Sequence, residues 1–217
     1  MRERYTKQLD NLHNNLIHMG SLCEEAIACA AKTLIDGNLD MKEKVLSVEN
    51  DTNMAERDIE QLCVRLLLLE QPVASDLRQI TAAQKMITDM ERISDQAVDI
   101  AELSAYMKGN SVKSDIHIAE MSRATIGMVT ASIDSFVSKD FAKAREVIAS
   151  DDVVDDLFLK IRKELIQHIT ENPAVASECL DLLMVAKYFE RIGDHAVNIA
   201  EWVLYSLTGD RYATTLE

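Results

Sequence analysis

A twelve-residue segment that occurs twice is the feature that most restricts what this chain can fold into. Residues 91–102 and 190–201 are identical at nine of their twelve positions and lie 99 positions apart. Upstream the match continues at an offset of 102, where Val45 aligns with Val147 and Glu49 with Asp151. A repeat of this length indicates a duplicated structural unit. We therefore expect two similar halves, the first of which has a longer connection before its copy of the segment.

Apolar residues recur every three or four positions along both halves. The pattern is continuous over residues 9–30 and 45–69, which is typical of helices that pack side by side in a bundle. The chain has only 2 Pro and 6 Gly among 217 residues, and both residue types weaken helices. An all-α fold is therefore predicted.

Residues that favour turns divide this pattern into six helices, three in each half. The first helix should end at 36–38 and the second at Gln71-Pro72. Ser75 is the predicted N-cap of the third helix. Gly109-Asn110 marks the domain boundary, so we expect two pseudo-symmetric three-helix bundles, residues 1–108 and 111–217. The last four helices are predicted over 75–108, 114–137, 140–170 and 174–207.

The charge of the chain excludes one class of function. The formal net charge is −14 and no cluster of Lys and Arg is present, so nucleic-acid phosphates would be repelled. No signal peptide and no membrane-length apolar run are found. The 4 cysteines lack the spacing of a disulfide framework. We expect a soluble, cytoplasmic protein with reduced cysteines and no direct contact with nucleic acid.

Carboxylates lie on one side of the repeated segment when it is helical. At about 100° per residue, Asp95 lies near 40° from Glu91 and Asp99 near 80°, while the apolar residues fall on the opposite face. The second copy places Glu190 and Asp194 in the same way, with Asn198 and Glu201 beside them. Each half therefore carries an acidic stripe.

Such a stripe needs a compensating cation. Like charges four residues apart destabilise a helix by about 0.2–0.5 kcal/mol per pair, so either a basic side chain or a metal ion is expected nearby. Oxygen ligands suit Mg, Ca, Mn or oxidised iron, and zinc remains open. The preceding helix offers more carboxylates, Asp151 and Asp155 in the second half but only Glu49 in the first, where Asn53 is neutral. His195 lies off this line and is interpreted as a surface or packing residue.

The chain resembles the PhoU family of phosphate-transport accessory proteins. The resemblance depends on Glu-Arg-Ile-Ser-Asp at 91–95, Glu-Arg-Ile-Gly-Asp at 190–194 and the link into the third helix at 71–78. It implies surface metal sites, often multinuclear iron or zinc. Two departures from the family's pattern follow: Asn53 and Asn198 are neutral, so the two sites are expected to differ in occupancy, and Ser94 stands in place of Gly193, which would crowd a cluster in the first half. The implied ligands are Glu91, Asp95, Asp99, Glu190, Asp194, Asp151, Asp155 and Glu49.

The resemblance also implies a role that composition and spacing do not reveal. It implies a non-enzymatic negative regulator of phosphate uptake and of the phosphate-starvation response. The implied partners are a membrane phosphate ABC transporter and a sensor histidine kinase, with contact to the membrane only through them. It favours a homodimer.

Two other interpretations were weighed against this one. A di-iron enzyme in a helical bundle would need Glu-x-x-His motifs, and none is present, because Glu164 and His168 are one residue too far apart. No nucleophile–base set or phosphate-binding loop was found either. A structural helical scaffold whose acids are only solvated remains the alternative.

Overall fold

The computed structural model describes residues 2–38, 40–70, 72–107, 112–113 and 116–215. This described part is helical, without strands, so the all-α prediction is confirmed. A short 3-10 turn at Pro173–Val175 precedes the last helix. The six helices are α1 (Arg2–Asp36), α2 (Asp40–Glu70), α3 (Ala74–Tyr106), α4 (Ile118–Ser138), α5 (Phe141–Glu171) and α6 (Ala176–Thr208).

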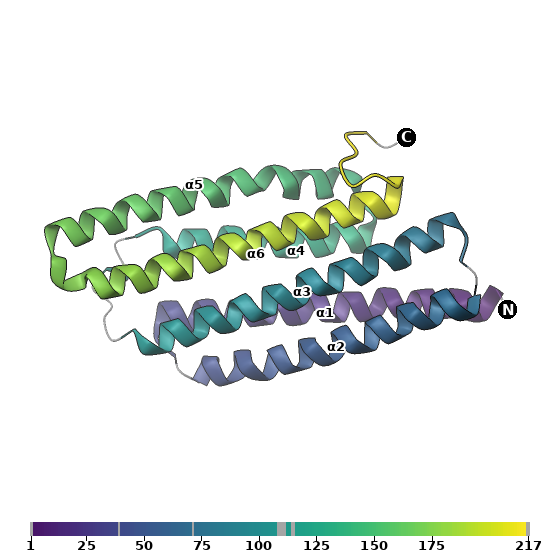
Figure 1. Ribbon diagram of the computed structural model, residues 1–217, viewed down its shortest axis with the longest axis horizontal. Coiled ribbons are helices and arrows are strands. Elements are labelled where there is room, and N and C mark those ends of the chain that lie inside the picture. Colours follow the sequence, from purple (N-terminus) through teal and green to yellow (C-terminus); the bar gives the residue numbers. More distant parts are fainter. Residues whose placement is uncertain (1, 39, 71, 108–111, 114–115, 216–217) are drawn as a thin grey trace.

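The helices form the two predicted three-helix bundles. Helices α1, α2 and α3 pack on one another, as do α4, α5 and α6. The bundles join side by side, because α3 packs along α6 and α1 along α4. Figure 1 shows α2, α3, α6 and α5 in this order as one layer, with α1 and α4 behind it. The two helices that contain the repeated segment therefore meet at the centre of the molecule.

The apolar seams meet in one core that extends through both bundles. In the repeated segment, Ile93, Ala97 and Ile100 are fully buried, and so are their counterparts, which are Ile192, Ala196 and Ile199. Removing these side chains from water is the main favourable contribution to folding. The predicted division of each repeated helix into a core side and an acidic side is thus confirmed.

Three helices begin at other residues than the approximate predicted starts: α3 one residue before 75, α4 four residues after 114 and α6 two residues after 174. Helix α3 starts at Ala74, and the extended Val73 (φ −77°, ψ 169°) is its N-cap in place of Ser75. Helix α4 starts at Ile118, since the backbone N–H of His117 donates to Glu164 at 3.1 Å. Helix α6 starts only after the 3-10 turn.

The remaining boundaries are close to the prediction. Asp140 is the N-cap of α5, and its carboxylate accepts a hydrogen bond from the Lys143 N–H at 3.0 Å. Helix α3 ends at Tyr106, whereas Lys108 and the predicted domain boundary at Gly109-Asn110 lie outside the described residues. The proposed domain limits therefore stay predictions.

None of the described helices has an apolar stretch long enough to cross a bilayer. All four cysteines are free and buried.

Candidate metal centre

Four of the predicted ligands come together in the second half. Asp151 and Asp155 lie on α5, and Glu190 and Asp194 lie on the facing side of α6. Burial, followed by repulsion from Asp155 and Asp194, raises the pKa of Asp151 from 3.8 to about 6. Its Oδ1 atom is also only 3.7 Å from the position that a Cβ on Gly193 would occupy. We call these four side chains the second-half cluster.

Positive charge is scarce around the second-half cluster. Lys187 forms an ion pair with Glu190 one turn earlier on α6. Burial and then Glu190 raise the pKa of Asp194, although Lys187 and His195 oppose the rise. Among the residues that the structure describes, Lys187 is therefore the one Lys or Arg that forms an ion pair with these four carboxylates.

The first half brings together Glu91, Asp95 and Glu49, which we call the first-half cluster. Burial, and then the charge of Asp95, raise the pKa of Glu91, and Glu49 across the α2–α3 contact contributes in the same direction. Arg92 lies against both acids of α3, with Nη1 3.2 Å from Asp95 and Nε 3.4 Å from Glu91. Asn53 donates to Glu49 at 2.6 Å. This cluster is therefore partly neutralised by its own neighbours.

Glu56 belongs to the same surface and was missed in the sequence. Burial and Glu60 raise its pKa, and the charges of Arg92 and Asp95 also act on it. A comparison of the halves hides Glu56, because its counterpart at the offset of 102 is Phe158. The spacing of seven residues from Glu49, which places both on one helical face, could have revealed it.

Asp99 and Asn198 lie at the seam between α3 and α6. Burial and acidic neighbours on α3 raise the pKa of Asp99, and Arg191 of α6 opposes the rise. The Asn198 amide donates to Asp89 Oδ1 at 3.1 Å, and His195 Nδ1 lies 2.9 Å from the same oxygen. Asn198 was predicted to lie beside Glu190 and Asp194 on one face of its helix, and its side chain forms a hydrogen bond across the seam. His195, expected to be a surface or packing residue, contacts the same aspartate of the other half.

The last glutamate of each acidic stripe, Glu102 or Glu201, lies near a basic residue. Glu201 accepts a hydrogen bond from Arg211 at 2.5 Å, and this arginine also lies 4.0 Å from the Trp202 ring centroid. Glu102 is 3.9 Å from Lys42. These glutamates are therefore structural partners rather than members of either cluster.

The donor set fits a hard cation better in the second half than in the first. Within the described residues, no three His, Cys, Asp or Glu side chains converge on one point. The second-half cluster nevertheless offers only carboxylate donors from two packed helices, and burial, followed by the neighbouring carboxylates, raises the pKa of Asp151. A Cβ at Gly193 would make ordinary contacts, the nearest at 3.5 Å from Val154. The Cβ that Ser94 adds at the matching position therefore does not by itself crowd a site.

Comparisons with known proteins agree with this architecture. The model of the PhoU domain matches residues 16–104 and 118–203, one match in each half. A phosphate-specific transport system accessory protein PhoU homolog from Clostridium acetobutylicum is 33% identical over 210 residues, which cover 96% of each chain. A homolog of the same name from Aquifex aeolicus is 35% identical over 186 residues, covering 85% of this chain and 84% of the relative.

Two solved structures share the fold. The crystal structure of PhoU from Pseudomonas aeruginosa superposes with a TM-score of 0.91 at 32% identity and covers 94% of this chain and 99% of that one. The phosphate transport system regulatory protein PhoU from Streptococcus pneumoniae gives a TM-score of 0.88 at 24% identity, covering 96% and 99%, and supports the fold alone. The duplicated six-helix architecture, matched along both halves, places the chain in the PhoU family.

Proposed function

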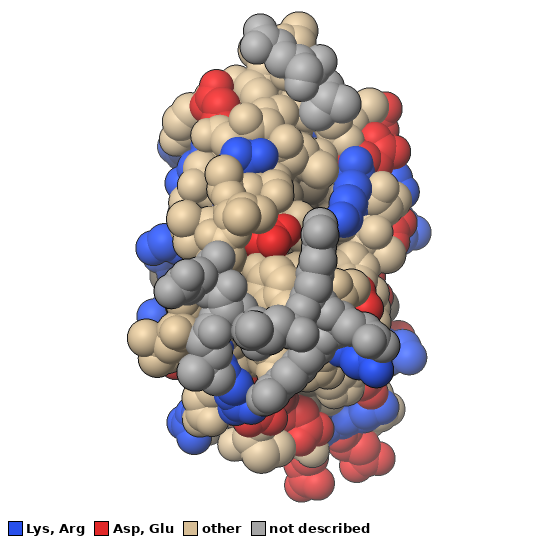
Figure 2. Space-filling model, turned by 90° about the vertical axis from the view of Figure 1, so that its right-hand side faces the viewer, with Lys and Arg blue, Asp and Glu red and all other residues tan. Residues whose placement is uncertain are grey.

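We propose that this chain is a non-enzymatic accessory protein that restrains phosphate uptake and the phosphate-starvation response. The observation that carries the proposal is similarity along the whole chain, 96% of each sequence, to a curated phosphate-specific transport system accessory protein. The chain has a net charge of −14, and Figure 2 shows Asp and Glu side chains interspersed with Lys and Arg at one end of the molecule, so charged side chains are available there for contacts with other proteins. The protein would act from the cytoplasm, with a phosphate ABC transporter and a sensor histidine kinase as partners, and as a homodimer.

A metal ion on the second-half cluster is part of the proposal. Asp151 and Asp155 would hold it from α5, and Glu190 and Asp194 from α6. When bound, the ion would neutralise these carboxylates and tie α5 to α6. Iron or zinc is expected first from the family resemblance, and Mn, Mg or Ca would also suit oxygen ligands. Lys187 would have to release Glu190, since both cations use the same carboxylate.

The first-half cluster would form a weaker site. Glu91, Asp95 and Glu49 would be its ligands, with Asp99 at the edge of the seam. Arg92 already contacts two of these carboxylates, so a metal ion would have to displace a guanidinium group. Unequal occupancy of the two sites is the expected result.

Deletion of the gene tests the regulatory role. In a strain grown in excess phosphate, loss of the protein should raise phosphate uptake and the expression of starvation genes. Restoring the wild-type chain should reverse both effects. Unchanged uptake and unchanged expression in the deletion strain would contradict the proposal.

The second candidate is a scaffold of the same system that needs no metal. It is favoured by one observation, that Arg92 and Lys187 already form ion pairs with three of the predicted ligands. The two candidates differ in what happens when the second-half cluster is neutralised. A variant with Asp151→Asn and Asp194→Asn should fail to restrain uptake if metal is required, and should act as the wild type if the scaffold is sufficient.

A further inference from the structure

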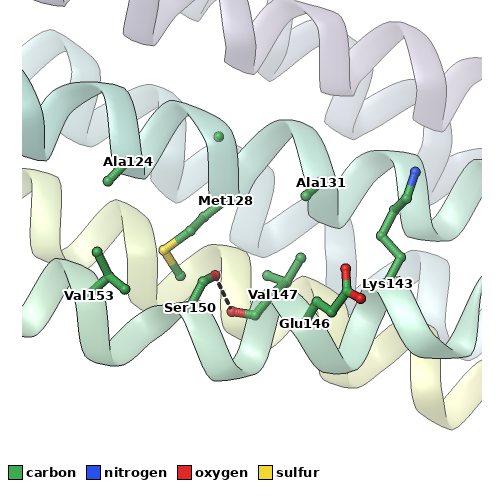
Figure 3. A pocket seen from close by; sticks show the side chains of 9 residues that line it. Ala124, Met128, Ala131, Lys143, Glu146, Val147, Ser150 and Val153 are labelled. Atoms are coloured by element: carbon green, nitrogen blue, oxygen red, sulfur yellow. Dashed lines mark hydrogen bonds between the residues drawn. The ribbon is translucent and has the colours of Figure 1, made fainter.

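A groove opens between α4 and α5. Figure 3 shows Ala124, Met128 and Ala131 of α4 facing Val147 and Ser150 of α5 across it. Its volume is about 310 Å³, and its lining is almost entirely apolar. The groove exists because α4 carries small residues here, with Gly127 between the two alanines, so that the helices leave space between them.

The first half fills the corresponding space. At the offset of 102, the counterpart of Ala124 is Leu22, which is buried between the first-half helices. The counterparts of Gly127 and Glu146 are Glu25 and Lys44, whose side chains form an ion pair at 2.5 Å. The second half has Ala124, Gly127 and Glu146 at these positions, so it has neither the leucine nor the ion pair there. The duplication thus serves as an internal control, and it identifies the groove as a feature of one half alone.

Polar groups around the groove are already engaged, with one exception. The Ser150 hydroxyl donates to the Val147 carbonyl oxygen at 2.7 Å. Lys143 lies 3.4 Å from Asp134. Glu146 is exposed at the rim and makes no ion pair with any residue that the structure describes. A polar small molecule would find little to bind, whereas an apolar side chain accompanied by a positive charge would match both the floor and the rim.

We propose that this groove docks an amphipathic helix of another component of the phosphate transport system. The helix would place an aliphatic side chain over Gly127, Met128 and Val147, and a Lys or Arg one turn away would pair with Glu146. This inference rests on the proposed function, because it assigns to that partner a surface of this chain.

The shape of the groove favours a helix as the occupant. Small residues at 124, 127 and 131 lie along one face of α4, and such residues let a second helix approach closely. Val153, 53% exposed at one end of the groove, extends the apolar surface along α5. Glu146 stands where the first half has Lys44, and this single acid would be complemented by a basic side chain of the partner.

Filling the groove tests the inference without unfolding the protein. A Cβ on Gly127 would meet no atom within 4 Å. Glycine inside a helix also makes the helix less stable than most other residues would. Gly127→Leu should therefore be at least as stable as the wild type by thermal unfolding. Glu146→Lys provides a second variant that leaves the groove open. Ala149→Leu, at an exposed position of α5 that does not line the groove, is the matched control.

The variants are expressed in the deletion strain, and phosphate uptake is measured in excess phosphate. Gly127→Leu and Glu146→Lys should each raise uptake towards that of the empty deletion strain, and Ala149→Leu should restrain uptake as the wild type does. Wild-type restraint by either groove variant would overturn the inference and leave the proposed function standing. Deletion without effect on uptake would instead overturn the proposed function, and the inference with it.

A photoreactive residue introduced at position 149, exposed on α5 beside the groove, identifies the occupant in the same strain without filling the groove. The expected crosslink joins this position to a helical segment of the transporter that carries a basic residue. A crosslink only to a second copy of this chain, or only to a segment without a basic residue, would overturn the inference.

Discussion

Replacing Asp151 with Asn is expected to stabilise the metal-free protein. Burial and the surrounding carboxylates raise the pKa of this residue from 3.8 to about 6. At pH 7 a rise of this size corresponds to roughly 3 kcal/mol of unfavourable free energy if nothing screens the charges. Asp151 is only half-buried and Asp155 and Asp194 are exposed, so water screens the repulsion. We therefore expect a gain of about 1 kcal/mol, or roughly 2–4 °C in Tm for a chain of this length.

The pH dependence of the free energy of unfolding tests independently whether the charge of Asp151 destabilises the fold. The folded state binds the Asp151 proton more tightly than the unfolded chain, where this carboxyl group titrates near 3.8. The free energy of unfolding of the wild type should therefore fall as the pH rises from 4 to 6. The contribution of Asp151 to this fall should be missing from Asp151→Asn, so the stabilities of the two proteins should converge at pH 4 and separate at pH 7.

Urea unfolding in the presence of a chelator measures both the stability gained by Asp151→Asn and the dependence of this gain on pH. Asp156→Asn removes the same charge from an exposed position of α5 outside the cluster and serves as the control. Added Mn²⁺ should reverse the order, since a ligand at 100 times its Kd stabilises the wild type by about 2.7 kcal/mol and the variant by less. An Asp151→Asn protein less stable than the wild type without metal, at every pH, would refute this view of the cluster.

Asp89→Ala should cost about 1–3 kcal/mol in urea unfolding, because His195 and a neighbouring amide lose their common acceptor across the α3–α6 seam. Arg211→Ala should change stability by about 1 kcal/mol or less, and it should shift the emission of Trp202, the only tryptophan, to the red by uncovering its ring. The four buried thiols should not react with Ellman's reagent until the protein unfolds, since burial raises the pKa of the Cys63 thiol to about 12.

Local sequence patterns were enough to predict the helices and the two acidic stripes. Ile93 and Asp95 follow the same periodicity, so their opposite faces could be assigned from spacing alone. Helix starts were less predictable, because they depend on contacts from elsewhere in the chain. The start of α4 after His117 is set by Glu164, 47 residues away.

The composition of the clusters depended on tertiary structure in the same way. Asn198 was assigned to the acidic stripe by its place in the repeat, but its hydrogen-bond partner Asp89 lies 109 residues away in the other bundle. Glu56 could not be identified from the repeat, because its counterpart in the second half is Phe158. The spacing of the carboxylates predicted a cation beside each acidic stripe. It could not reveal that Arg92 supplies part of the positive charge in the first half.

Elemental analysis of the untagged protein, purified without chelator, tests the metal-carrying account most directly. We expect stoichiometric iron, zinc or manganese in the wild type, and a clear loss of that metal when Asp151→Asn is combined with Asp194→Asn. Lys187→Ala, which frees Glu190 from its ion pair, should keep or increase the metal content. Wild-type protein without metal, or a double variant that retains the full amount, would contradict the assignment of the second-half cluster as the principal site.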